Sequence, residues 1–577
     1  MGSAAIVSTV RTSDGLALAV QEEGPPGAPV VVAVHGYPDD HSVWSGVVAD
    51  LARDHRVVTY DVRGAGDSEA PAEREGYRVV RLADDLRDVI DAVSPDGPVH
   101  LLAHDWGSVQ AWQLVSDPSA RDRLASYTSI SGPALPHIGA FSRSAPVRER
   151  LRQAAASWYI GFFQLPVLPE LAWRSGVFGA AMARRERIPR PRVRDAVRGL
   201  NLYRANRQGP PDPRRETTVP VQVLAPSADR YVTPALAASA ARWVPDLRLR
   251  EIRAGHWLPR TRPEVVARCV REQIAAVTAP ALAPGALATG SAAAGLPRAG
   301  SPAAGLRGVG RPGLGRWTDR IVLVTGAGRG IGRAVAQGFA RRGALVVAVD
   351  KDRATAERTA FETGGCAYAV DVTDAAAMED LAERVCAEVG VPDVVVNNAG
   401  IAVSGPFLAH SAKDWQDILD VNVLGVVHGC RLFGARMRER GEGGHIVNVA
   451  SAAAFTPTRF LPAYCTTKSA VLMLSECLRA ELAEDGIGVT ALCPGFLPTD
   501  IAGSARFVGS ADPEAEQRRT DSLLKRRPYP LDKVADAVVS AVERNKPVQL
   551  LTVESRTAHA LTRVAPTVLR RLARLSP

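Results

Sequence analysis

The sequence contains few cysteines, few lysines and no long hydrophobic run. Its 577 residues include seven cysteines, an odd number, and no two of them form a CxxC pair. This usage predicts a reducing compartment and argues against a framework of disulfides. The N-terminus lacks a basic segment followed by an apolar one, and no apolar run approaches the roughly 18 residues of a membrane span. We therefore expect a cytoplasmic protein.

The positive charge does not by itself point to a nucleic-acid partner. The formal net charge is +9, yet only six lysines occur, and the first of them is Lys351. The remaining basic residues are arginines, whose abundance alongside Ala, Val and Gly indicates a compositional bias. Basic runs interleaved with aromatics, which nucleic-acid binding needs, are absent. The eleven histidines show no metal-ligand spacing, so we predict no metal site.

The chain is too long for one hydrophobic core and divides at a stretch of distinct composition. Residues 279–316 are dominated by Ala, Gly and Pro, which predicts a flexible linker; an ordered strap is the alternative. On either side, at 1–278 and 317–577, strands alternate with helical patterns and Gly-rich turns. This predicts two α/β domains with mostly parallel sheets. Residues from about 134 to 215 contain no clean strand and are expected to form an inserted helical lid.

The segment Leu101–Trp112 is the most informative part of the first half. A buried strand ends in His104, and Asp105 then stands between the small residues Ala103 and Gly107 before a helix begins. This arrangement predicts a nucleophile elbow, in which small neighbours permit a sharp turn that exposes the nucleophile. A carboxylate nucleophile suits attack on an sp³ carbon and forms an ester that water then cleaves. A helix-capping Asp is the alternative.

Two later loops supply the partners that such a nucleophile needs. Asp229 follows the strand 219–225, and His256 follows the strand 247–252. The chain order of nucleophile, acid and base is that of a hydrolase with a nucleophile elbow. We expect Asp229 to orient His256, which then activates the water that hydrolyses the ester.

Residues 1–278 resemble α/β-hydrolases of the epoxide hydrolase group. The resemblance rests on HGYP at 35–38, HDWG at 104–107, the Asp229 loop, GHW at 255–257, and the lid segments 158–164 and 200–204. It implies that Tyr159 and Tyr203 donate hydrogen bonds to the epoxide oxygen. It also implies that the backbone N–H groups of Tyr37 and Trp106 hold the oxyanion of the second step. The aromatic lid favours a lipophilic epoxide.

Two other interpretations of the first half stay open. A haloalkane dehalogenase shares the Asp-Trp-Gly turn, although such enzymes often have an amide side chain at the position of Tyr37. The tyrosine pair favours the epoxide. A non-catalytic lipid-binding module that delivers substrates to the second half is another alternative.

The second half begins with a glycine-rich turn between a strand and a helix. TGAGRGIG at 325–332 permits a tight turn and close approach of the backbone to a pyrophosphate at the helix N-terminus. The next strand ends in Asp350, placed to accept a hydrogen bond from a ribose hydroxyl. Tyr464 and Lys468 are four residues apart and so share a helix face.

Residues 317–555 strongly resemble a short-chain dehydrogenase/reductase with a Rossmann fold, a doubly wound parallel sheet. The motifs are TGAGRGIG, NNAG at 397–400, YCTTK at 464–468 and PGFLPT at 494–499. The resemblance implies that Tyr464 is the acid/base, with a pKa lowered by Lys468 and the nicotinamide. Ser451 would bind the substrate oxygen, and Asn422 would hold a proton relay. The implied cofactor contacts are Gly326, Arg329, Gly330, Ile331, Gly332, Asp350, Asp371, Val372, Asn398, Tyr464, Lys468, Pro494, Gly495 and Thr499.

We expect NAD as the cofactor, because the charge of Asp350 repels a 2′-phosphate. NADP is the alternative, since Arg329 and Lys351 are cations that could neutralise it. The resemblance also implies a homo-oligomer formed through this domain. The basic tail from about 555 to 577 is expected to dock on its own domain or a neighbouring subunit; contact with a membrane surface is the alternative.

The fusion suggests a bifunctional enzyme. Epoxide hydrolysis yields a vicinal diol, which is an alcohol that the second domain could oxidise to a hydroxyketone. A linker would raise the local concentration of the intermediate at the second site. Two independent activities, fused for shared expression, are an equal alternative. We therefore expect an epoxide, a diol or a ketone as substrate.

Overall fold

The computed structural model describes residues 6–208, 216–278, 317–318, 320–495, 497, 505–510, 512–525, 529–565 and 567–568. The predicted linker at 279–316 lies outside these residues. The chain forms two compact units, one on each side of that segment, and each is treated by itself.

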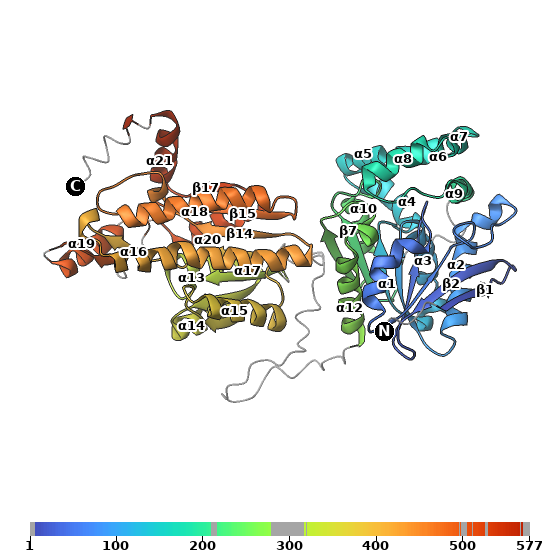
Figure 1. Ribbon diagram of the computed structural model, residues 1–577, viewed down its shortest axis with the longest axis horizontal. Helices are drawn as coiled ribbons and strands as arrows, with labels where there is room; N and C mark the ends of the chain where they lie inside the picture. The colour runs from blue at the N-terminus through green and yellow to red at the C-terminus, as the bar shows by residue number, and fades with distance from the viewer. Residues whose placement is uncertain are drawn as a thin grey trace. The chain divides into compact units, whose positions relative to one another are not determined.

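An eight-stranded sheet is the centre of the first unit (Figure 1). Its spatial order is β1-β2-β4-β3-β5-β6-β7-β8. The first two pairs in this order are antiparallel, and the remaining pairs are parallel. The strands are β1 (Ile6–Arg11), β2 (Ala17–Glu23), β3 (Val30–Val34), β4 (Arg56–Tyr60), β5 (Val99–His104), β6 (Leu124–Ile130), β7 (Val221–Pro226) and β8 (Leu247–Ile252).

Helices cover both faces of this sheet. One face packs against α2 (Val79–Val93) and α3 (Trp106–Val115), and the other against α1 (Ser45–Leu51) and α12 (Pro263–Thr278). Strands that are buried on both faces need near-continuous apolar sequence, which β3 and β5 have. Shorter helices α10 (Pro234–Ala238) and α11 (Leu258–Thr261) follow β7 and β8.

The predicted lid is helical in the residues that the structure describes. It consists of α4 (Leu135–Ser144), α5 (Val147–Ala156), α6 (Trp158–Phe163), α7 (Leu168–Arg174), α8 (Val177–Glu186) and α9 (Val193–Ala205). Helices α5 to α8 gather along one edge of the unit, beyond the ends of the strands (Figure 1).

The second unit is built on a seven-stranded parallel sheet. Its spatial order is β11-β10-β9-β12-β14-β15-β17. The chain adds strands to one side of β9 up to β11 and then to the other side from β12 onward, so the strand order reverses between β9 and β12. In such sheets ligands bind outside the carboxyl ends of the strands at the reversal point. The strands are β9 (Ile321–Thr325), β10 (Leu345–Asp350), β11 (Cys366–Ala369), β12 (Val394–Asn397), β14 (Gly444–Val449), β15 (Ile487–Cys493) and β17 (Val548–Leu550). A separate short pair joins β13 (Val403–Ser404) to β16 (Arg506–Phe507).

Helices also cover both faces of the second sheet. α13 (Gly330–Ala340), α14 (Arg353–Thr363) and α20 (Leu531–Glu543) contribute to the core on one face. α15 (Ala375–Glu388), α17 (Gly425–Arg440) and α18 (Pro462–Glu481) cover the other. The remaining helices are α16 (Ala412–Leu419), α19 (Pro513–Lys525) and α21 (Val553–Val564).

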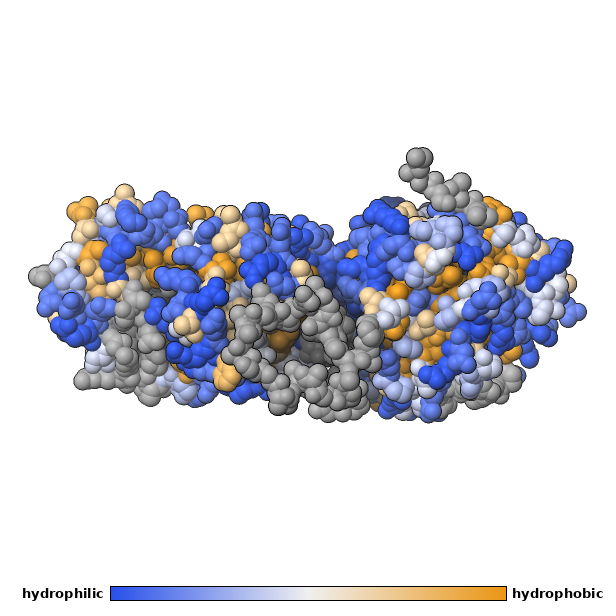
Figure 2. Space-filling view, turned by 90° about the horizontal axis from the view of Figure 1, so that it is seen from below, coloured by the Kyte–Doolittle hydropathy of each residue, from blue (hydrophilic) through white to orange (hydrophobic). Residues whose placement is uncertain are grey.

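The continuous helical stretch Ala412–Arg440 is long and apolar enough to cross a membrane by length and composition alone. Its α17 part, however, buries Cys430, Phe433 and Met437 in the core of the second unit. We therefore interpret it as a core helix. On the face shown in Figure 2, hydrophilic residues predominate and hydrophobic ones form separate patches.

The predicted fold class is confirmed for both halves. The antiparallel edge β1–β2 was not predicted, because its sequence alternates weakly and contains polar residues throughout. β14 ends at Val449, and Ser451 then precedes a short helical turn, where its hydroxyl accepts a hydrogen bond from the Ala453 N–H.

Candidate active sites

The turn between β5 and α3 holds Asp105 in an unusual backbone conformation, with φ 50° and ψ −122°. Three glycines make room for it. A Cβ at Gly36 or Gly132 would overlap atoms of Asp105, and a Cβ at Gly107 would overlap carbonyl oxygens at the end of β3. The predicted elbow therefore depends on glycines from three separate segments. Strained conformations of this kind are typical of functional sites.

Asp105, His256 and Asp229 form one connected set. His256 Nε2 lies 3.5 Å from Asp105 Oδ2, and His256 Nδ1 lies 3.0 Å from Asp229 Oδ2. Asp229 Oδ1 also accepts hydrogen bonds from the backbone N–H groups of Tyr231 and Val232, at 2.8 and 3.0 Å. These bonds fix the carboxylate, which in turn orients the imidazole. The structure thus brings together the three residues that the sequence placed in separate loops.

The charges of this set are strongly coupled. Burial works to raise the pKa of Asp105, but the hydrogen bond and charge of His256 outweigh it and lower that pKa. The pKa of Asp229 is lowered against burial in the same way. Burial works to lower the pKa of His256, but the two carboxylates raise it to about 10. Asp105 is therefore ionised at neutral pH, as a nucleophile requires.

Two lid tyrosines face this set. Tyr159 comes from α6 and Tyr203 from α9, and their rings meet edge to face at 5.9 Å. Burial raises the pKa of both phenols well above the ordinary value, so both remain neutral hydrogen-bond donors. The backbone N–H of Tyr37 donates to Asp105 Oδ1 at 2.8 Å. Trp106 is the first residue of α3, and the role of its N–H group stays a prediction.

These groups line a cavity of about 160 Å³. Most of the wall is aromatic or aliphatic. The lining residues are Tyr37, Pro38, Asp105, Trp158, Tyr159, Phe163, Trp173, Phe178, Ala181, Met182, Arg185, Tyr203, Tyr231, His256 and Trp257. The sequence analysis missed Trp173, Phe178, Met182, Arg185, Tyr231 and Trp257. Two of these offered a signal: Tyr231 stands two residues after Asp229, and Trp257 directly follows His256 in the GHW motif.

Gln153 connects the lid to the loop that carries Asp229. Its side-chain oxygen accepts hydrogen bonds from the N–H and the hydroxyl of Thr233, at 2.9 and 2.8 Å. Its amide donates to the carbonyl of Tyr231 at 2.8 Å. Gln153 lies on α5 and is 8% exposed, so these bonds are shielded from water. This contact was not predicted.

In the second unit, the glycine-rich turn joins β9 to α13. Gly326 and Gly330 have φ values of 61° and 55°, which residues other than glycine rarely adopt. A Cβ at Gly328 would overlap Thr355 and approach Asp350, and one at Gly332 would overlap the Gly326 carbonyl. The turn therefore leaves its backbone open toward the carboxyl edge of the sheet. This cradle fits the pyrophosphate of a dinucleotide.

Asp350 closes the glycine-rich turn. Its Oδ2 accepts a hydrogen bond from the Gly328 N–H at 2.9 Å, and its Oδ1 accepts one from the Asp352 N–H at 3.1 Å. Asn398 supports the same turn, because its amide donates to the carbonyls of Thr325 and Gly326, each at 3.0 Å.

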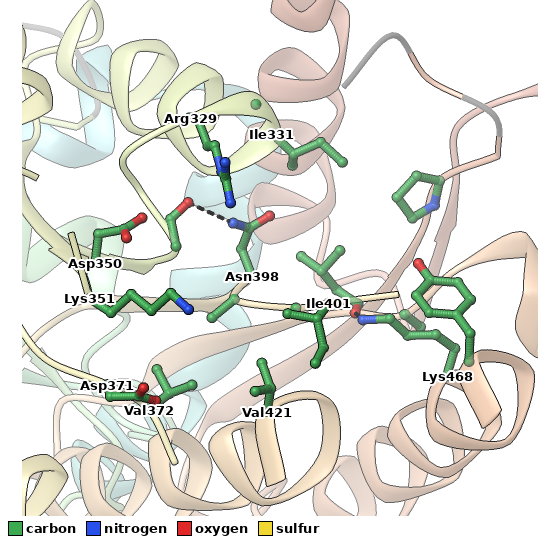
Figure 3. Close-up of a pocket in the computed structure, with 18 of the residues that line it drawn as sticks. Arg329, Ile331, Asp350, Lys351, Asp371, Val372, Asn398, Ile401, Val421 and Lys468 are labelled. Atoms are coloured by element: carbon green, nitrogen blue, oxygen red, sulfur yellow. Dashed lines mark hydrogen bonds between the residues drawn. The ribbon is translucent and has the colours of Figure 1, made fainter. Parts of the chain in front are cut away.

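A cavity of about 290 Å³ runs along this edge. Figure 3 shows Asp350, Lys351, Asp371 and Val372 at one end and Lys468 at the other. Its other predicted members are Gly326, Arg329, Gly330, Ile331, Asn398, Tyr464 and Pro494. Val370, Ala399, Gly400, Ile401, Val421, Val449 and Ala450 also line it and were not predicted. Such an elongated cavity suits a molecule with two separated ends.

Tyr464 and Lys468 lie one helical turn apart on α18. The Lys468 ammonium is 5.6 Å from the centre of the Tyr464 ring and donates to the Val449 carbonyl at 2.8 Å. Burial raises the pKa of Tyr464 to about 12, although a hydrogen bond with Ser451 opposes this. Burial lowers the pKa of Lys468 to about 8. The shift of the Tyr464 pKa is opposite to the expected lowering, and the effect of Lys468 together with a bound nicotinamide stays a prediction.

Asn422 is fully buried in a π-helical turn, Asp420–Leu424, between α16 and α17. Its oxygen accepts a hydrogen bond from the Ile401 N–H at 2.9 Å, and its amide donates to the Ile401 carbonyl at 3.0 Å. π-helical turns inside helices are frequent at functional sites. The predicted helix over this segment did not include that irregularity.

Three predicted cofactor residues are not among the described residues that line the cavity. Gly332 packs beneath the turn, and Gly495 packs against Thr552. Thr499 lies outside the described residues.

In the basic tail, Ala558 on α21 joins the core of the second unit, and the ring of His559 packs on that of Phe455, with 5.0 Å between the ring centres. The first part of the tail thus docks on its own domain, while residues from 569 onward lie outside the described residues.

Comparison with known proteins agrees with this division. Residues 29–263 match the family model of the alpha/beta hydrolase fold, and residues 320–507 match that of the short chain dehydrogenases. The chain is 43% identical to "Probable oxidoreductase EphD" of Mycobacterium tuberculosis over 602 aligned positions, covering 98% of both chains. The chain belongs to the EphD family. The chain thus joins an α/β-hydrolase domain to a short-chain dehydrogenase domain.

Other matches concern the second half. D-threitol dehydrogenase of Mycolicibacterium smegmatis is 38% identical over 195 residues, which cover 33% of this chain and 75% of that protein. A solved short-chain dehydrogenase from Burkholderia phymatum, in complex with NAD, is 29% identical, with a TM-score of 0.39, and covers 44% of this chain and 92% of its own. Family membership confirms that the chain is an NAD(P)-dependent oxidoreductase with an α/β-hydrolase domain.

Proposed function

We propose that the first unit hydrolyses a lipophilic epoxide to a vicinal diol. The observation that carries this proposal is the placement of Tyr159 and Tyr203 in the same cavity wall as Asp105 and His256. A carboxylate nucleophile beside a histidine base is compatible with several hydrolase reactions. Two neutral phenols that face the carboxylate suit the opening of an epoxide, because its ring oxygen becomes an alkoxide.

The reaction proceeds in two balanced steps. An Asp105 oxygen attacks a ring carbon, the carbon–oxygen bond breaks, and a lid phenol gives the released oxygen its proton. His256 then removes a proton from water, the hydroxide adds to the ester carbonyl, and the ester carbon–oxygen bond breaks as the leaving oxygen takes that proton from His256. The remaining proton of the water returns to the phenolate, so release of the diol restores both the Asp105 carboxylate and the phenol. The Tyr37 N–H already donates to Asp105 Oδ1, so it stands where the oxyanion of the second step forms.

The second unit uses NAD in this proposal. A bound nicotinamide supplies hydride transfer, while Tyr464 exchanges the substrate proton and Ser451 holds the substrate oxygen. Lys468 lines the same cavity as Tyr464, with its ammonium 5.6 Å from the centre of that ring, and binds the ribose hydroxyls in this proposal. Asp350 favours NAD, because its carboxylate is already fixed by the N–H groups of Gly328 and Asp352 and its charge repels a 2′-phosphate.

We further propose that the two sites act in sequence on one molecule, with the diol oxidised to a hydroxyketone. The similarity of the second unit to a D-threitol dehydrogenase supports this, since D-threitol carries vicinal hydroxyl groups. The alternative of two independent activities predicts a different product pattern.

The decisive experiment incubates the full-length protein with NAD and a panel of lipophilic epoxides, and follows NADH and product mass. Sequential action predicts that epoxide drives NADH formation, that Asp105→Asn abolishes it, and that added diol restores it. Tyr464→Phe should stop the reaction at the diol. Diol formation with no NADH would refute the sequence while leaving hydrolysis intact. Unchanged hydrolysis in Asp105→Asn would refute the hydrolase mechanism itself.

A further inference from the structure

Large apolar side chains are exposed along helices α5 to α8 of the lid. We call these residues and their neighbours from 147 to 187 the lid surface. Leu168 and Leu171 on α7 are 56% and 54% exposed, and Val167 just before them is 62% exposed. Its other strongly exposed apolar members are Val147, Leu151, Trp158 and Val177. Contiguous exposed apolar residues of this kind mark binding surfaces.

The helices of the lid surface pack on one another in succession. The ring of Trp158 on α6 lies 6.3 Å from that of Phe162, and Phe162 lies 6.3 Å from Phe178 on α8. Trp173 on α7 meets the same Phe178 at 4.8 Å. Figure 1 shows α5 to α8 along one edge of the unit. Ring contacts therefore join α6, α7 and α8, the helices that carry Trp158, Leu168, Leu171 and Val177.

The excess of positive over negative residues in the chain is concentrated in the lid. Residues 135–207 contain 14 arginines, no lysine and four acidic residues, a formal net charge of +10, whereas the entire chain has +9. Three of the four acids are paired with arginines: Glu170 with Arg204, Glu186 with Arg185 at 3.8 Å, and Asp195 with Arg194 at 2.9 Å. The basic excess is therefore not spread evenly, as a compositional bias alone would predict.

The hydrolase cavity opens at this surface. Trp158 and Arg185 both line the cavity, yet Trp158 is 63% exposed and the Arg185 side chain is also 63% exposed. An amphipathic ring and a cation thus frame the entrance to an apolar cavity. Trp and Arg are residues that favour the boundary between lipid and water.

We propose that the lid surface docks on an anionic lipid layer and that substrate enters the hydrolase cavity from that layer. Apolar helix faces flanked by arginines bind at lipid–water interfaces. Arginines near an anionic surface add electrostatic attraction. The lid surface contains seven arginines and three acidic residues, so it should prefer acidic lipids. A lipophilic substrate then passes from the layer to Asp105 without crossing water. This proposal goes beyond the hydrolytic activity, because lipid binding does not require turnover.

The test measures sedimentation of the full-length protein with vesicles of phosphatidylglycerol or of phosphatidylcholine. We expect binding to the anionic vesicles, at least tenfold weaker binding to the neutral ones, and weakening as salt rises from 0.1 to 0.5 M. The double variant Leu168→Glu/Leu171→Glu should bind anionic vesicles at least tenfold more weakly. Phe361→Glu, at a 90% exposed position on α14, is the matched control and should bind as the wild type does.

A second readout separates this proposal from the catalytic one. The double variant should hydrolyse a short, water-soluble epoxide at the wild-type rate, and should lose its rate only on epoxide carried in vesicles. Equal vesicle binding by the wild type and the double variant would overturn the proposal. So would an absence of vesicle binding together with a dimer that the double variant converts to a monomer, because the lid surface would then be a protein interface.

Discussion

The ring of Tyr231 lies edge-on against the imidazole of His256, with 4.7 Å between the ring centres. The same ring meets Tyr159 at 5.3 Å, so it stands between the base and one of the two phenols. Its backbone N–H also donates to Asp229. One residue therefore contacts three of the groups assigned to the hydrolase reaction.

We expect Tyr231→Leu to lower kcat for epoxide hydrolysis about tenfold, or about 1.4 kcal/mol of transition-state stabilisation. The shape of the ring, and not its hydroxyl, holds the imidazole, so Tyr231→Phe should retain most of the activity. Steady-state kinetics on a soluble epoxide measures both variants. Equal losses in the two would show that the hydroxyl takes part in the chemistry.

The titration of His256 should depend on Asp105. Two carboxylates raise the pKa of the folded-state imidazole to about 10, so it remains protonated through neutral pH and loses its proton only as pH rises toward that value. In Asp105→Asn one of these charges is gone, and the pKa should fall. Forming the ester removes the same charge, which would free the base for water activation. Histidine NMR on both proteins measures this, and an unchanged titration would contradict the coupling.

The stability of the first unit should depend on the lack of a side chain at the glycines that surround Asp105. A Cβ at Gly132 would overlap the backbone carbonyl of Asp105, so Gly132→Ala should destabilise the first unit by roughly 2 kcal/mol or more. Gly161 in α6 has open space at its Cβ position, and Gly161→Ala should be neutral or stabilise by about 0.5–1 kcal/mol. Urea unfolding followed by fluorescence compares the two. A Gly132→Ala protein as stable as the wild type would show that the elbow can relax.

Cofactor choice should depend on Asp350. Asp350→Ser removes the charge that repels a 2′-phosphate, and we expect the ratio of kcat/KM for NAD over NADP to fall at least tenfold. Glu362→Gln, on the outer side of α14, alters a carboxylate that pairs with Arg333 and serves as the control. An unaltered ratio in Asp350→Ser would assign the choice to Arg329 and Lys351 instead.

The parts of both sites that follow strands could be predicted from the sequence. Asp105 directly follows β5, Asp350 ends β10, and Asp229 and His256 lie in the loops after β7 and β8. Parallel strands bring their carboxyl ends to one edge of each sheet. Residues such as Trp173, Met182 and Gln153 could not be predicted. They come from lid helices whose packing depends on contacts with distant segments, and no local pattern records those contacts. The raised pKa of Tyr464 was missed for a similar reason, since burial is a property of the folded unit.

The hydrogen bonds of Gln153 have a consequence for engineering. The lid supplies most of the cavity wall, so it would be the natural segment to exchange between relatives in order to change substrate range. Because Gln153 holds the N–H and hydroxyl of Thr233 and the carbonyl of Tyr231, α5 is joined to the loop that positions Asp229. A transplanted lid would therefore need a matching amide at this position, or grafting would misalign Asp229 even where the new lid keeps both tyrosines.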